Sequence, residues 1–216
     1  MKRKILLFVA VIMLTINVSA QYKEFQFGLM GQPGYNWLTV SSGKIFDVQN
    51  NFSYKYGLFG SFYFSENYGF LTGFYMLQQK AKYKFEYEIS EFKTEYSHTF
   101  NVSYIQLPLL LKCRTDMMAK TIRISGQFGA GLDFLVNHKD TYDFIGETDN
   151  SNLAKYRNFG MSLMIGIGTE VAVFKTSSLV FHVVLDKSFT SVIKTGGYYD
   201  SPMKMTSLYF EIGFIF

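Results

Sequence analysis

The sequence contains little cysteine, proline or tryptophan. Its 216 residues contain one cysteine, Cys113, three prolines and one tryptophan. A single cysteine excludes a scaffold of intramolecular disulfides. The residues around Cys113 resemble the end of a strand, so we expect a small buried or lipid-facing side chain rather than a nucleophile.

Long apolar runs are also missing after residue 20. No later segment approaches the roughly 18 uninterrupted apolar residues of a membrane-spanning helix, which excludes a helical membrane protein. A membrane barrel remains possible, because its strands alternate apolar and polar side chains. Aromatic residues are abundant, with 23 Phe and 16 Tyr, and many lie near predicted strand ends, as in the interfacial girdles of membrane barrels.

Residues 1–20 have the parts of a secretory signal peptide. A cationic start at residues 2–4 precedes an apolar run over residues 5–18, and residues 18–20 read Val-Ser-Ala. The run is short for a membrane anchor and small residues follow it directly, so we predict cleavage between Ala20 and Gln21. The mature chain, residues 21–216, is predicted to be one barrel domain.

The charge balance gives no reason to predict a nucleic-acid partner. Three of the 21 Lys+Arg residues lie in the signal, which leaves 18 against 17 Asp+Glu and lowers the net charge from +4 to +1. His98 and His138 lie at or near predicted long loops without a clustered second ligand. We therefore expect no metal and no cofactor.

The last nine residues have the alternation of a strand with one wholly apolar face. Residues 208–216 read Leu-Tyr-Phe-Glu-Ile-Gly-Phe-Ile-Phe, and a period of two puts Leu208, Phe210, Ile212, Phe214 and Phe216 on one apolar face. An unpaired strand of this kind invites aggregation, whereas closure in a bilayer removes the edge and covers the apolar face. We expect this strand to pair with the first strand, and its terminal Phe216 to be recognised by the barrel-assembly machinery.

Seven further segments alternate in the same way. The clearest is residues 121–136, where Ile122, Ile124 and Phe128 oppose Arg123 and Ser125. The predicted strands are residues 24–35, 52–64, 68–85, 96–113, 121–136, 158–174, 178–189 and 208–216.

The connections alternate between long (residues 36–51, 86–95, 137–157 and 190–204) and short (residues 65–67, 114–120 and 175–177). This pattern predicts an all-β, eight-stranded antiparallel up-and-down transmembrane β-barrel in the outer membrane, with long loops outside the cell and both termini in the periplasm. The 137–157 loop, with Asp140 and Asp143, is predicted to be solvated and mobile. A soluble lipocalin-like barrel is the alternative architecture.

Side chains should fill the interior of an eight-stranded barrel. The strand parities place these polar residues inside: Gln106, Lys112, Arg123, Asp133, Glu170, His182, Asp186 and Glu211. The short turns predict that Lys112 faces Arg123 and that Glu170 faces His182. Buried charges persist when paired, so we expect a structural salt-bridge network, with a proton or ion path as the alternative.

No catalytic residues are predicted. Ser162, His182 and Asp186 all point inward, but His182 and Asp186 are four residues apart on one strand, about 13 Å, too far for a triad. Two basic-aromatic stretches, residues 54–56 and 80–84, are expected at the lipid headgroups, where Lys and Tyr snorkel and contact lipopolysaccharide.

Residues 104–112, Tyr-Ile-Gln-Leu-Pro-Leu-Leu-Leu-Lys, resemble the fourth-strand signature of the PorT-like outer-membrane β-barrel family of Bacteroidetes. Gln106 stands where the family usually has Glu. Residues 27–29, the Gln after the signal and the final Phe are also similar to that family, and one of its members assists type IX secretion and gliding.

These observations predict a non-enzymatic barrel with an envelope-structural or partner-binding role through its long external loops. The alternatives are a narrow pore or an accessory of transport or type IX secretion. Less favoured are a rim enzyme acting on lipid and a soluble lipocalin-like binder.

Overall fold

The computed structural model describes residues 25–40, 45–89, 92–118, 121–144, 147–149, 155–174, 177–194 and 202–216. The predicted signal, residues 1–20, lies outside these ranges. Eight long strands form the wall: β1 (Phe25–Val40), β3 (Asn51–Tyr63), β4 (Tyr68–Ile89), β5 (Phe92–Arg114), β6 (Ile122–Phe144), β8 (Phe159–Ala172), β9 (Ser178–Ser188) and β10 (Met203–Ile215).

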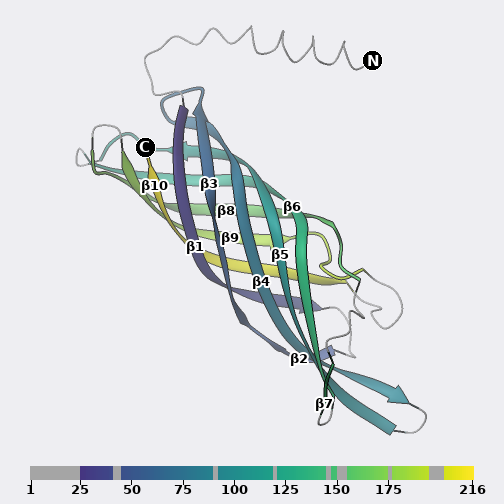
Figure 1. Cartoon of the computed structure of the whole chain (residues 1–216). Coiled ribbons are helices and arrows are strands. Elements are labelled where there is room, and N and C mark those ends of the chain that lie inside the picture. Colours follow the sequence, from purple (N-terminus) through teal and green to yellow (C-terminus); the bar gives the residue numbers. More distant parts are fainter. Residues whose placement is uncertain are drawn as a thin grey trace, which may run out of the picture.

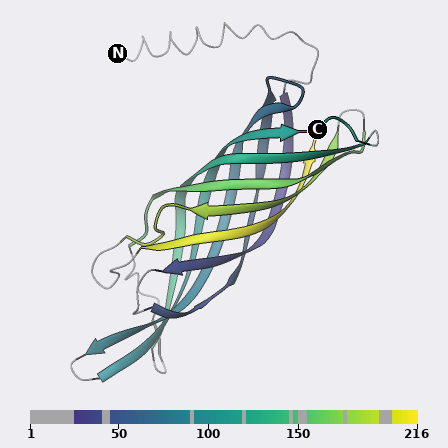
Figure 2. The ribbon, with the colours of Figure 1, turned by 180° about the vertical axis from the view of Figure 1, so that it is seen from behind.

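The wall closes on itself. Each long strand pairs antiparallel with the next, and β1 pairs with β10 from Gly28↔Ile215 to Val40↔Met203. The amide of Phe216 donates to the carbonyl of Phe27 at 2.9 Å and extends the seam. The predicted eight-stranded antiparallel barrel is therefore confirmed (Figures 1 and 2).

The two faces of the wall differ in polarity as the alternation predicts. On β6, Ile122, Ile124 and Phe128 are exposed, whereas Ser125 and Gln127 are buried. The closing strand follows the same rule, with Phe210, Ile212 and Phe216 outside. Within the described ranges, no helix is long and apolar enough to cross a membrane.

One end of the barrel carries short turns and the other carries long connections; we call them the short-turn end and the long-loop end. At the long-loop end the wall extends beyond its predicted length. The short strands β2 (Ile45–Gln49) and β7 (Glu147–Asp149) pair with β4 and β6 there, inside segments predicted as loops.

The predicted loop over residues 86–95 is wrong in large part. β4 and β5 stay paired as far as Ile89↔Phe92 and form a two-stranded arm that projects beyond the barrel (Figure 1). The sequence prediction ended these strands at residues 85 and 96, within a stretch rich in Lys and Glu.

A bulge in β6 changes which residues face inward. Tyr104 of β5 pairs with Leu135, but the adjacent Ser103 pairs with Asn137, so Val136 is an extra residue. Beyond it, even-numbered residues of β6 point inward, and Asp140 is only 2% exposed. The prediction that Asp140 belongs to a solvated loop is therefore wrong.

Candidate functional site: the polar lumen

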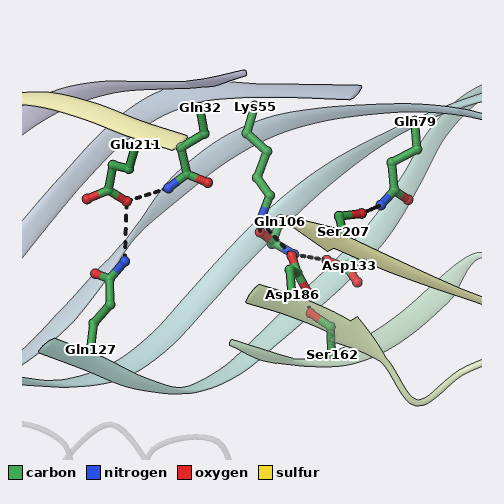
Figure 3. Close-up of polar contacts among 10 residues, drawn as sticks. All are labelled: Gln32, Lys55, Gln79, Gln106, Gln127, Asp133, Ser162, Asp186, Ser207 and Glu211. Atoms are coloured by element: carbon green, nitrogen blue, oxygen red, sulfur yellow. Dashed lines mark hydrogen bonds and ion pairs between the residues drawn. The ribbon is translucent and has the colours of Figure 1, made fainter. Parts of the chain in front are cut away.

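Five buried side chains from five strands form a central cluster: Lys55, Gln106, Asp133, Ser162 and Asp186. The Lys55 ammonium lies 2.5 Å from Asp186 Oδ2 and donates to Gln106 Oε1 at 2.9 Å. The Gln106 amide nitrogen lies 2.7 Å from Asp133 Oδ1, 3.1 Å from Asp186 Oδ2 and 3.4 Å from Ser162 Oγ. Figure 3 shows these side chains converging across the lumen.

The placement of Lys55 at the lipid headgroups is wrong. Its side chain is fully buried, and its ammonium also lies 4.3 Å from the ring centroid of Tyr209. The parity of β3 carries the missed signal: Tyr54 and Tyr56 face outward, so the residue between them must face inward.

One ion pair and one cation–π contact lie nearer the short-turn end. Lys112 contacts Glu170 at 2.5 Å, and the Arg114 guanidinium lies 3.8 Å from the ring centroid of Tyr63. Both members of the Lys112–Glu170 pair are buried, so each offsets the cost of burying the other.

Both predicted cross-strand pairings are wrong by a few residues. Lys112 faces Gln127, and Arg123, which is half-buried, faces Glu170. His182 faces Gly168, while Glu170 faces Val180. The sequence predicted the parity correctly, but the register depends on where each turn is centred, and turn residues fix that only through their backbone geometry.

Ser125, His182 and Glu211 form a hydrogen-bonded chain. Ser125 Oγ lies 2.7 Å from His182 Nε2, and His182 Nδ1 lies 2.8 Å from Glu211 Oε1. The other oxygen of Glu211 accepts from the amides of Gln32 and, at 3.3 Å, Gln127 (Figure 3).

These three residues are hydrogen-bonded in the order found in a serine-hydrolase triad, but a substrate has no access to the serine. Ser125 is 1% exposed, so a substrate carbonyl could reach its oxygen only by displacing lumen side chains. Ser162 and Asp186 belong to the central cluster and are not joined to His182 by any bond between described residues. The arrangement fixes the orientation of an imidazole in a packed interior.

A third cluster, near the long-loop end, was missed by sequence reasoning. Tyr83 Oη lies 2.7 Å from His98 Nδ1, and His98 Nε2 lies 3.0 Å from Asp140, which also accepts from Tyr156. The ring of His98 stacks on Tyr142 at 4.2 Å. His98 shares its parity with the inward Phe100, Val102 and Tyr104, so the alternation could have placed it; Asp140 could not be placed without the bulge.

Among the described residues, buried side chains pack the centre of the lumen. A cavity of about 20 Å³ lies beside Asp133, Ser162 and Asp186, enough for about one water molecule. Glycines make room for large rings: a Cβ on Gly57 would lie 2.9 Å from the Tyr75 ring. Within the part of the chain that the structure describes, no group of three His, Cys, Asp or Glu residues is arranged to hold a metal.

An antiparallel cylinder with an apolar exterior, a packed charged interior and no free edge between its first and last long strands defines an outer-membrane β-barrel. Residues 38–194 match the family described as outer membrane protein beta-barrel domain, and the chain belongs to that family. It is therefore an outer-membrane protein.

Solved structures of outer-membrane proteins are similar to the chain at low identity. Ail, the attachment invasion locus protein of Yersinia pestis, crystallised with the heparin analogue sucrose octasulfate, is 13% identical (89% of this chain, 99% of that one, TM-score 0.43). OprG of Pseudomonas aeruginosa is 10% identical (87% and 94%, TM-score 0.40). A search of curated proteins found no match.

Proposed function

We propose that the protein is a non-enzymatic barrel that holds a partner-binding surface at the long-loop end. The observation that carries this proposal is the β4–β5 arm. Among the described residues, the pairing of β5 with β6 ends at Ser97↔Asp143, and β2 is the strand that lies alongside the base of the arm. A two-stranded ribbon in water is marginally stable by itself and presents unpaired backbone groups, both of which favour a bound partner.

The packed lumen supports a scaffold rather than a conduit. The central cluster joins five strands through one cation and two carboxylates, and it occupies the space through which a solute would pass. A pore would require a continuous water-filled path, as in barrels with many more strands.

Three features of the sequence complete the proposal. Residues 1–20 direct export and are removed after Ala20, and Phe216 ends the strand that the assembly machinery recognises. The likeness of residues 104–112 to the PorT-like signature supports a place in that subgroup, where a role as a secretion accessory is the second candidate.

The test is co-purification from outer membranes with and without the arm. Replacing residues 86–95 by a two-residue turn should abolish capture of the partner while the barrel still shifts on heating in gel electrophoresis. Replacing residues 65–67, at the short-turn end, by a turn of equal length is the control. A partner retained without the arm, or lost with the control, contradicts the proposal.

A further inference from the structure

The outer wall at the long-loop end carries an ordered set of lysines. Lys80 on β4 pairs with Asn101 on β5, and Asn101 pairs with Lys139 on β6. All three side chains are exposed. Lys82 lies two residues further along β4, on the same face, opposite Thr99. We call Lys80, Lys82, Asn101 and Lys139 the lysine patch.

The patch lies just beyond the apolar belt on the same three strands. Met76 pairs with Ile105, and Ile105 pairs with Phe134. On these strands, the three residues form the last outward-facing row of the apolar belt before the polar residues begin. Lys80 is four positions after Met76, about 13 Å along a strand, or about 10 Å towards water at the usual tilt. The headgroup layer occupies this height, since it adds about 5–8 Å on each side of the hydrocarbon core.

The charges of the patch are uncompensated by described side chains. Lys84, the next outward lysine of β4, is paired with Asp47 at 3.1 Å. No ion pair of Lys80, Lys82 or Lys139 occurs among the residues whose side chains the structure describes. Two strand spacings of about 4.8 Å separate the backbones of Lys80 and Lys139, so two ammonium groups can flank one phosphate while the Asn101 amide lies between them.

We propose that the lysine patch binds the phosphorylated sugar headgroup of an outer-leaflet glycolipid, whose acyl chains lie over Ile105 and Phe134. The protein surface complements both parts of such a ligand. The anionic phosphates contact the lysine patch, and the acyl chains contact the apolar belt next to it. A soluble anion would match the patch alone. The proposal rests on the proposed orientation, with the long-loop end at the cell surface.

The test uses the full mature chain refolded in non-ionic detergent. The probes are bis-phosphorylated lipid A, the same lipid after dephosphorylation, and inorganic phosphate. The readout is the temperature at which the heat-modifiable gel shift occurs. The patch variant is K80Q/K82Q/K139Q, and the control is K155Q/K187Q/K204Q, which removes the same charge from exposed lysines elsewhere on the long-loop half.

We expect bis-phosphorylated lipid A to raise the transition temperature of the wild type and of the control by several degrees, and that of the patch variant by less than half as much. The other two probes should raise none of them. Equal shifts in the two variants, or an equal shift with dephosphorylated lipid, would overturn the proposal.

The single variants K80Q and K139Q keep the test decisive if the triple variant does not refold, since each should lose part of the shift. The arm deletion is expected to leave the lipid response intact, so failure of this inference and failure of the partner proposal are distinguishable.

Discussion

At the scale of single residues, Lys55 is the cation that holds the central cluster together. Its ammonium contacts Asp186 and Gln106, and Gln106 in turn holds Asp133. All of these groups are buried, so none can recover its hydration if a partner is removed.

Replacing Lys55 by Ala should therefore destabilise the barrel by about 3–5 kcal/mol, because it leaves the buried carboxylates without a counter-charge. Urea unfolding in detergent, followed by circular dichroism, measures the loss. Asp186→Asn in the Lys55→Ala background should restore part of it. A loss below about 1 kcal/mol, the usual size for an exposed pair, would contradict a central role for this cation.

Gly168 lies where β9 comes too close to β8 to leave room for a side chain. A Cβ there would lie 1.8 Å from the carbonyl oxygen of Phe181 and 2.4 Å from His182 Cδ2, so the β8–β9 ladder would have to separate. Gly31, on β1, has nothing within 4 Å of a built Cβ.

We expect Gly168→Ala to lower the yield of heat-modifiable barrel severely and Gly31→Ala to leave it near that of the wild type. The folded fraction on semi-native gels compares the two. Similar yields for both variants would show that β8 and β9 adjust without cost.

At the scale of elements, the bulge at Val136 changes which residues of β6 face the lumen. Before the bulge, Asp133 points inward at an odd position; after it, Asp140 points inward at an even one. Val136 itself is 55% exposed and has no partner in the β5–β6 register.

Deleting Val136 should be tolerated, because the neighbouring residues then form a regular ladder and every side chain keeps its face. Deleting Ile105, which pairs with Phe134 on the partner strand, should prevent folding, because it reverses one part of β5. The gel shift in detergent separates these outcomes. A failure of the Val136 deletion would mean that the bulge is needed for curvature rather than merely accommodated.

At the scale of the whole molecule, closure and packing together predict an electrically silent barrel. Planar bilayers containing the purified protein should show no unitary conductance, since the central cluster fills the lumen. The Glu211→Ala variant should also show no conductance, because the central cluster remains. A stable channel in the wild type would favour the conduit.

Orientation is a second property of the whole molecule. In a Cys113→Ser background, a cysteine replacing Asp47 at the long-loop end should react with an impermeant maleimide on intact cells. A cysteine replacing Glu66 at the short-turn end should react only after the outer membrane is opened. The reverse pattern would place the arm and the lysine patch in the periplasm.

Much of the fold follows from the sequence because alternation has a physical consequence that needs no tertiary information. A strand with one apolar and one polar face, repeated eight times with alternating short and long connections, has a single low-energy solution in a bilayer. The eight long strands, their closure and the inward positions of Asp133, Glu170, His182, Asp186 and Glu211 follow from it.

The tertiary structure alone decided which polar groups meet. The β8–β9 register, two residues away from the predicted one, places His182 opposite Gly168 instead of Glu170. The β9–β10 register places His182 opposite Glu211, and one bulge brings Asp140 to His98. These contacts join neighbouring strands, and the residues that meet depend on strand register and barrel shear, neither of which a period of two determines. The sequence by itself determined which faces meet lipid and water; the closed barrel determined the pairing of the charges.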